Sequence, residues 1–264
     1  MYNLSIMTSG ERNFGEAKQP EVIPAVQEIL RIQSNPVMFD ILSVIRHAES
    51  GVTTSQLMTE MDGIPTSTLF HQCTRLEEEG LITKGTAEKR SLTQLGESAT
   101  DALQDYQERL LKPMRDAGIQ RFAQQFSVVH AEELSRELSE AKGTAEHSGA
   151  PALLRLMRIE ADPSRLRLLH ILAGSQEEPV AFRDILGLMQ SAQGRIFPGS
   201  TLSNLLTELE RECLLIRESG FCFRLTTLGS EAVLAYQEYQ DRIKGSLVDY
   251  WRNRFSKDFG IKPS

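Results

Sequence analysis

The stretch PTSTLFHQCTRLEEEGLI, residues 65–82, has the pattern of an amphipathic helix with a defined end. Its apolar residues recur at intervals of four and three positions and therefore share one helix face: Leu69, Cys73 and Leu76. Gly80 suits the left-handed conformation that ends many helices, and we expect the hydroxyls of Thr66 and Ser67 to cap the start. The opposite face carries short polar side chains and an arginine, which are types that hydrogen-bond to base edges and phosphates.

A second copy of this pattern, PGSTLSNLLTELERECLLI, occupies residues 198–216, at an offset of 133 residues from the first. The same offset holds for later segments of the chain. LTQLG at 92–96 corresponds to LTTLG at 225–229, and YQERL at 106–110 corresponds to YQDRI at 239–243. Identities that recur at constant spacing through turns indicate an internal duplication.

The duplication extends upstream of the first helix pattern. PAVQEILRIQSNP at 24–36 corresponds to PALLRLMRIEADP at 151–163, here at an offset of 127 residues. The second copy therefore contains about six extra residues, which we place in a loop near 190–197. In both copies a polar residue followed by proline, Asn35–Pro36 and Asp162–Pro163, predicts the start of a helix.

The periodicity predicts a mainly α fold with small β-hairpins. Helices are expected over 21–33, from 36 to about 49, over 53–61 and over 65–80. Short strands at 82–84 and 91–93 then form a hairpin, and a long helix follows from Gln94 with a break near Pro113. The second copy repeats this order, with strands at 215–217 and 223–225 and a long helix from Leu228.

The repeat also predicts the domain organisation. Residues 1–20 are expected to form a flexible N-terminal arm, 21–126 the first domain with its flanking helices, and 151–264 the second. Between the domains, 127–150 is expected to be a connector, with a charged helix at 131–142 and a Gly/Ser-containing linker.

This order of elements resembles that of winged-helix DNA-binding proteins. The motif STLFHQCTRLEEEGLI, followed by a basic hairpin and then by LTQLG, resembles the corresponding segments of the PadR and MarR families of bacterial transcription regulators. The resemblance covers about 36–112 and 163–244. It implies two tandem winged helix-turn-helix domains, each with its third helix in the major groove and its hairpin, the wing, on the backbone or in the minor groove. In those families long flanking helices form a homodimer, so two copies in one chain imply a covalent pseudo-dimer, and a homodimer through the long helices is a further expectation.

The resemblance and the helix patterns together select the candidate DNA-binding residues. In the first copy these are Thr66, Ser67, Thr68, His71, Thr74 and Arg75 on the helix, and Lys84, Lys89 and Arg90 on the wing. In the second copy they are Ser200, Thr201, Asn204, Thr207 and Arg211 on the helix, and Arg217 and Arg224 on the wing. The second copy departs from the first at Cys213, which stands where the first has Gly80.

Composition argues against several other classes of protein. The 264 residues carry a net charge of −7, which disfavours indiscriminate binding to nucleic acid. The first residues lack the basic segment followed by an apolar one that marks a secretory signal, and the chain has only three cysteines. Both features predict a cytoplasmic protein with reduced thiols. The five histidines show no metal-ligand spacing, and no phosphate-binding loop or catalytic arrangement is recognisable, so we expect no metal, no cofactor and no enzymatic activity.

The first functional hypothesis is sequence-specific binding of double-stranded DNA by a bacterial transcription regulator. The second is a tandem winged-helix module for protein interaction, for example an accessory subunit of a chromosome-segregation complex. The acidic net charge of −7 favours the second hypothesis, and the duplicated helix and basic hairpin favour the first.

Overall fold

The computed structural model describes residues 23–48, 50–125, 150–175, 178–194 and 196–258. It confirms a mainly helical fold with small antiparallel sheets. The first half contains α1 (Pro24–Gln33), α2 (Pro36–His47), α3 (Thr54–Glu60), α4 (Thr66–Glu78), β1 (Ile82–Lys84), the 3₁₀ turn η1 (Thr86–Glu88), β2 (Arg90–Leu92) and α5 (Gln94–Gln125). The second half contains α8 (Ala150–Glu160), α9 (Pro163–Ala173), β3 (Val180–Ala181), α10 (Phe182–Gln193), α11 (Gly199–Arg211), β4 (Leu215–Glu218), β5 (Cys222–Leu225) and α12 (Thr227–Asp258). The expected N-terminal arm and the expected connector helix at 131–142 lie outside the described residues.

The starts of α2 and α9 agree with the sequence pattern. The side chain of Asn35 accepts hydrogen bonds from the backbone N–H groups of Val37 and Met38, at 3.0 and 3.2 Å. Asp162 caps α9 in the same way. At α4, by contrast, the expected capping by Thr66 and Ser67 is wrong. Pro65 occupies the N-cap position, so both hydroxyls lie within the first turn and no side chain caps the helix.

Each half has a β-hairpin, which is joined by a third, short strand in the second half and by a single bridging residue in the first. β1 pairs with β2, and β4 pairs with β5, both antiparallel. In the second half β3 pairs with β5, and in the first half Val52 forms an isolated bridge with Arg90 at the corresponding place. The sequence did not predict the third strand, because one or two residues are too few to show an alternating pattern.

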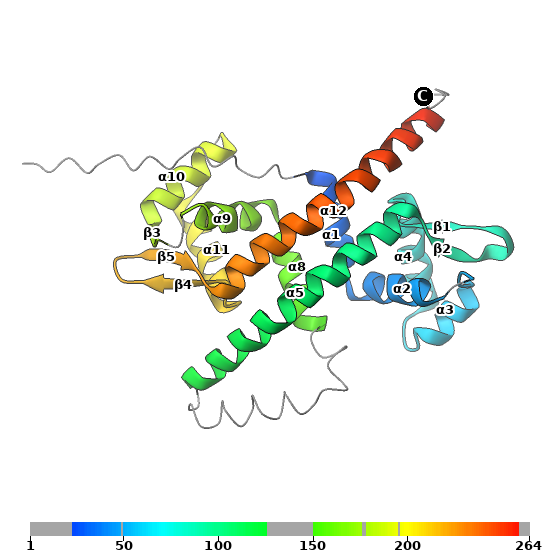
Figure 1. Cartoon of the computed structure of the whole chain (residues 1–264), viewed down its shortest axis with the longest axis horizontal. Coiled ribbons are helices and arrows are strands. Elements are labelled where there is room, and N and C mark those ends of the chain that lie inside the picture. The colour runs from blue at the N-terminus through cyan, green and yellow to red at the C-terminus, as the bar shows by residue number, and fades with distance from the viewer. Residues whose placement is uncertain (1–22, 49, 126–149, 176–177, 195, 259–264) are drawn as a thin grey trace, which may run out of the picture.

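The helices α5 and α12 run side by side in opposite directions along the length of the molecule (Figure 1). Apart from α1 and α8, which lie near the middle, the other elements of each half gather around the start of its own long helix, at opposite ends of this pair. The expected break near Pro113 is wrong, since α5 continues through it to Gln125. A proline removes one backbone hydrogen bond, and the packing of α5 against α12 along its length holds the helix together.

Corresponding residues of the two halves meet at the middle of the long helices. The rings of Tyr106 and Tyr239, which are related by the offset of 133 residues, lie edge to face with their centroids 6.2 Å apart. Arg109 on α5 pairs with Glu238 on α12, and the corresponding Arg242 on α12 pairs with Asp105 on α5. The same contacts therefore occur twice, with the two halves exchanged.

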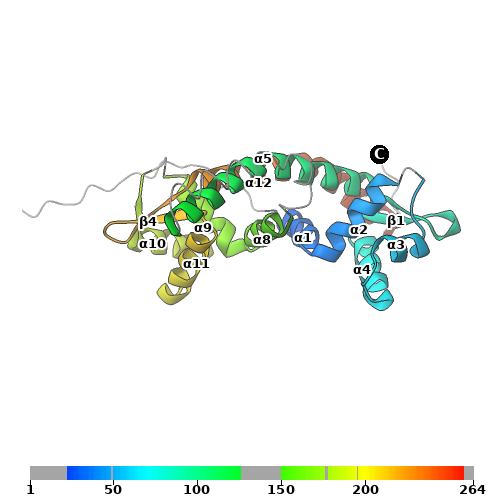
Figure 2. The ribbon, with the colours of Figure 1, turned by 90° about the horizontal axis from the view of Figure 1, so that it is seen from below.

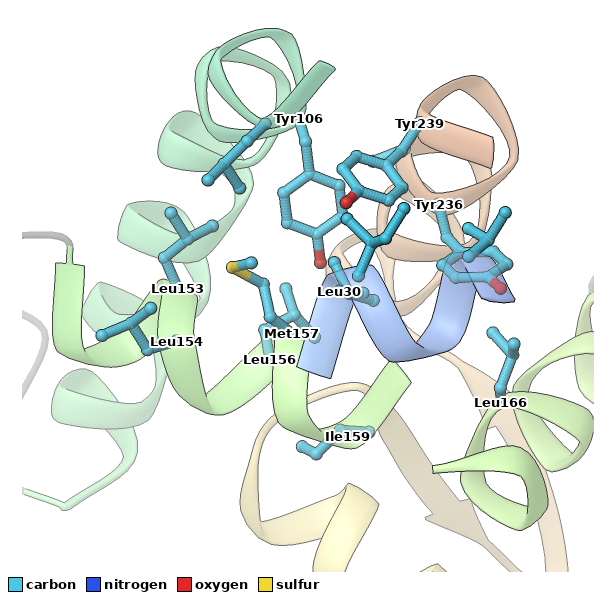
Figure 3. Close-up of a cluster of buried hydrophobic side chains, with 14 of the residues drawn as sticks. Leu30, Tyr106, Leu153, Leu154, Leu156, Met157, Ile159, Leu166, Tyr236 and Tyr239 are labelled. Carbon is cyan, nitrogen blue, oxygen red and sulfur yellow. The ribbon is translucent and has the colours of Figure 1, made fainter. Parts of the chain in front are cut away.

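Helices α1 and α8 pack against each other beneath the long pair. Figure 3 shows Tyr106 and Tyr239 pointing from the long helices toward Leu30 of α1 and Met157 of α8. Leu30 and Met157 have no exposed surface, and the buried apolar residues of both halves form one cluster. The relative position of the halves is consequently fixed by a shared core.

The hydroxyls of Tyr106 and Tyr239 donate hydrogen bonds to residues that correspond in the repeat but differ in type. Tyr239 donates to Oε1 of Gln33 at 2.5 Å, whereas Tyr106 donates to Oε2 of Glu160 at 2.6 Å. The amide nitrogen of Gln33 donates to the carbonyl of Ala99 at 3.0 Å. In the second half the matching atom is Oε1 of Glu160, which is buried without a hydrogen-bond partner. A protonated Glu160 can donate as Gln33 does, whereas an ionised one cannot.

Burial controls the ionisation of this region. Removal from water raises the pKa of Glu160 to about 8, although the hydrogen bond from Tyr106 acts in the opposite direction. Burial lowers the pKa of His170, on the neighbouring α9, to about 4. Tyr236 on α12 lies against His170, with ring centroids 6.2 Å apart, and burial followed by the charge of Glu160 raises its pKa.

We expect the free energy of unfolding to fall as the pH rises from 6.5 to 8. The folded state holds a proton on Glu160 up to a pKa of about 8, whereas the unfolded chain releases it near its ordinary pKa of 4.5. His170 has the opposite effect, but only between about pH 4 and its ordinary value of 6.5. Denaturant unfolding between pH 6.5 and 8 therefore isolates Glu160.

Glu160→Gln should remove this fall in stability and increase the free energy of unfolding at pH 8 by about 1–3 kcal/mol. Gln33→Glu is the matched variant and should make the fall steeper, because it places a second carboxyl group in the shared core. Parallel pH curves for the parent protein and Glu160→Gln would contradict the assignment.

Candidate nucleic-acid interface

Helix α4 buries its apolar stripe and presents its polar face to solvent. Leu69, Cys73 and Leu76 are at most 1% exposed, and α4 packs against α2. The predicted contact residues on the other face are exposed, apart from Thr68, which is half-buried: Thr66, Ser67, His71 and Thr74. The structure thus leaves these groups available to a ligand, and their contact with DNA stays a prediction.

Arg75 lies at the side of this face rather than on it. Its guanidinium is 3.1 Å from the carboxylate of Glu28 on α1. Burial acts to raise the pKa of Glu28, but the hydrogen bonds from Arg31 and Arg75 outweigh it and hold that pKa below its usual value. Arg75 therefore joins α4 to α1 through a partly exposed ion pair, and its contact with DNA stays a prediction.

The wing of the first half contains one residue that the sequence placed wrongly. Arg90 is 5% exposed. Its guanidinium donates to Glu77 of α4 at 2.9 Å and to the hydroxyl of Thr54 at 2.7 Å. Arg90 joins the wing to the helices and has no open path to a phosphate, so we withdraw it from the candidate set. Lys84 is exposed but lies 3.0 Å from Glu88, and Lys89 is half-buried.

Helix α11 is built in the same way as α4. It buries Leu202, Leu206 and Leu209, and its outward face carries the predicted residues Ser200, Thr201, Asn204, Thr207 and Arg211. The two outward faces share hydroxyl residues but differ elsewhere. His71 corresponds to Asn204, and Phe70 corresponds to Ser203. Each half therefore presents a different set of hydrogen-bonding groups.

The predicted cations of the second half have acidic neighbours. Arg211 lies 3.5 Å from Glu212, and Arg217 lies 3.6 Å from Glu210. Arg224 pairs with Glu218 across the hairpin. Side-chain exposure at these pairs reaches 65%, so water screens the attraction and each pair can exchange for a phosphate.

The long helices set the distance between α4 and α11. Gly96 near the start of α5 lies so close to the carbonyl of Leu81 that a Cβ would be 1.9 Å from it. Near the other end of α5, Arg121 donates to the carbonyl of Arg211 at 2.6 Å. These positions are 25 residues apart, or about 38 Å at the helical rise of about 1.5 Å per residue.

Helix α12 makes the two corresponding contacts, with the roles of the two halves exchanged. A Cβ on Gly229 would lie 2.0 Å from the carbonyl of Leu214, and Arg254 donates to the carbonyl of Glu78 at 3.0 Å. Figure 2 shows α4 and α11 on the same side of the α5–α12 pair. The contacts that hold the C-terminal ends of α4 and α11 are therefore about 38 Å apart along each long helix, and both helices lie on one face of the molecule.

The replacement of Gly80 by Cys213 in the second half is accompanied by a second difference, on the long helices α5 and α12. Gly80 and Cys213 both adopt positive φ, at 73° and 60°. A Cβ on Gly80 would meet the ring of Tyr250 at 2.1 Å, so a side chain has no room there. The residue of α5 that corresponds to Tyr250 is Ala117, whose side chain is smaller. The two halves therefore differ at both members of this corresponding pair.

Two exposed aromatic residues near the candidate faces were not among the predicted residues. Phe70 lies on the outward side of α4 and is 46% exposed, and Phe221 lies at the tip of the second hairpin and is 67% exposed. Phe70 follows Ser67 by three residues, so helical periodicity could have placed it on the same face. No pattern in the sequence indicates the exposure of Phe221.

Comparison with protein-family models, with curated proteins and with solved structures gave no match. Within the described part of the chain, acidic, histidine and cysteine side chains form no group that could hold a metal ion. Among the same residues, none of the helices has the length and apolar character needed to cross a bilayer. The function must therefore be argued from the geometry of the surface.

Arg90→Ala should reduce the free energy of unfolding by about 2 kcal/mol, because it leaves Glu77 and Thr54 without their partner in a partly buried site. The double variant Lys84→Ala, Lys89→Ala should stay within about 0.5 kcal/mol of the parent, because Lys84 is exposed and Lys89 is only half-buried. Chemical denaturation measures both. Equal stability of Arg90→Ala and the double variant would show that Arg90 does not anchor the wing.

Proposed function

We propose that this protein binds double-stranded DNA as a covalent pseudo-dimer of two winged helix-turn-helix units. The observation that carries the proposal is that the contacts holding the C-terminal ends of α4 and α11 lie 25 residues apart on α5, a backbone length of about 38 Å. Successive major grooves on one side of B-DNA lie about 34–36 Å apart. The length of about 38 Å along α5 is close to this spacing.

The outward faces supply suitable reading groups. On α4 these are the side chains of Ser67, His71 and Thr74, and on α11 those of Ser200, Asn204 and Thr207. An asparagine can make two hydrogen bonds to the edge of adenine, and hydroxyl groups can bond to several base edges or to phosphates. Because His71 and Asn204 differ, the two half-sites should form an imperfect palindrome.

The charges suggest how such binding is driven. With a net charge of −7 and wing cations that already have acidic neighbours, the protein offers little attraction to generic DNA. Its affinity should depend on the fit of two half-sites, with a shallow dependence on salt concentration. A protein that occupies one site selectively in this way suits the regulation of transcription, as the resemblance to the PadR and MarR families implies.

The second candidate function is protein interaction through the same faces. It is favoured by the pairing of Lys84 with Glu88 and of Arg217 with Glu210, which reduces the positive potential of both wings. The selection of bound DNA from a random pool separates the candidates. Enrichment of a two-part sequence supports DNA binding, and the absence of any shift of duplex DNA at low salt supports protein interaction.

The fixed spacing gives the sharper test. Once a selected sequence is known, insertion of five base pairs between its half-sites turns one of them to the far side of the duplex. Insertion of ten keeps the side but adds about one helical turn, roughly 34 Å. The α5–α12 pair cannot follow either change, so we expect both insertions to weaken binding by about 100-fold, to the level of one half-site.

Mobility-shift titrations with the three duplexes measure this effect, and a duplex with one half-site scrambled is the control. Equal affinity for all three spacings would mean that the halves bind DNA independently and would refute the fixed pseudo-dimer.

A further inference from the structure

The tip of the hairpin β4–β5 combines a strained backbone with an exposed aromatic ring, and neither feature is expected to stabilise the fold. Glu218 and Cys222 are paired, so the loop between them contains Ser219, Gly220 and Phe221. Gly220 and Phe221 are both left-handed, with φ of 75° and 57°. Glycine, asparagine and aspartate are the residues that suit such positions, and a bulky aromatic residue there is strained.

Phe221 is also 67% exposed, so its ring gains little from burial in the fold. The surrounding structure holds the strained backbone in place, because the carbonyl of Phe221 accepts a hydrogen bond from the N–H of Phe182, at the start of α10, at 3.0 Å. Strain that persists in this way is typical of binding and catalytic sites.

An arginine lies beside the exposed ring. The guanidinium of Arg217 is 5.7 Å from the ring centre of Phe221 and 5.4 Å from that of Phe223, which is buried. This cation–π contact limits the motion of both side chains before any ligand arrives, which lowers the entropy lost on binding. Arg217 also lies 3.6 Å from Glu210 on α11, so the tip is connected to the candidate reading helix.

We propose that Phe221 is a wedge that enters the minor groove beside the half-site read by α11 and kinks the DNA there. This proposal rests on the proposed DNA-binding function. A partly exposed guanidinium next to an exposed apolar ring suits the minor groove, which attracts arginine and in which proteins insert apolar side chains between base pairs.

The first half has no equivalent of this wedge. Its hairpin, residues 82–92, contains no aromatic residue, and its tip carries the ion pair between Lys84 and Glu88. The kink should therefore occur on one side of the operator only. It should fall at a pyrimidine–purine step, because such steps unstack most readily.

The test compares the parent protein with Phe221→Gly and Phe221→Trp on the DNA selected by the parent. Phe221→Gly removes both the strain and the wedge. We expect it to raise the melting temperature by about 2–4 °C, to weaken DNA binding by about tenfold and to reduce the bend measured by energy transfer between dyes at the duplex ends. Phe221→Trp keeps an aromatic ring and should preserve both affinity and bend.

Val248→Ser on α12 is the matched control, because Val248 is 49% exposed and lies on the long helix, outside both hairpins. It should change neither affinity nor bend. If Phe221→Gly binds and bends DNA as the parent does, the wedge is refuted while DNA binding stands. If the parent protein itself binds no DNA, the proposed function is refuted and the wedge with it, and Phe221 is then assigned to a protein contact.

Discussion

The antiparallel packing of α5 against α12 is the constraint on which the rest of the structure depends. Tyr106 and Tyr239 meet at its centre, and each end of the pair holds the other half's helix end through Arg121 or Arg254. A helix is a rigid element with a fixed rise per residue. The separation of α4 and α11 is therefore set by the number of residues between these contacts and does not depend on a flexible linker.

Duplication within one chain allows the two halves to diverge where two identical subunits could not. Gln33 and Glu160 occupy equivalent places in the shared core, but only the carboxyl group depends on pH. Gly80 leaves room for the ring of Tyr250, whereas the corresponding residues in the repeat are Cys213 and Ala117. A symmetric homodimer would repeat each residue on both sides, so it could hold neither a single carboxyl group nor a single aromatic wing tip.

The surface charges explain why the candidate interface does not stand out by composition. Most of the predicted wing and helix cations lie near a carboxylate of the same half, and the net charge of the chain is −7. Such pairs contribute little to stability when they are exposed. They reduce the attraction to generic DNA, as expected if the proposed recognition depends on shape and hydrogen bonds at two places.

The sequence by itself determined the duplication, the apolar stripes of α4 and α11 and the capped starts of α2 and α9. These features depend on residues within a turn or two of one another, so periodicity reveals them. Only the tertiary structure decided that Arg90 is buried against Glu77, that α5 passes through Pro113, that Glu160 meets Tyr106 and that Phe221 is exposed in a strained turn. Each of these depends on which distant segments pack together, and local pattern carries no information about that choice.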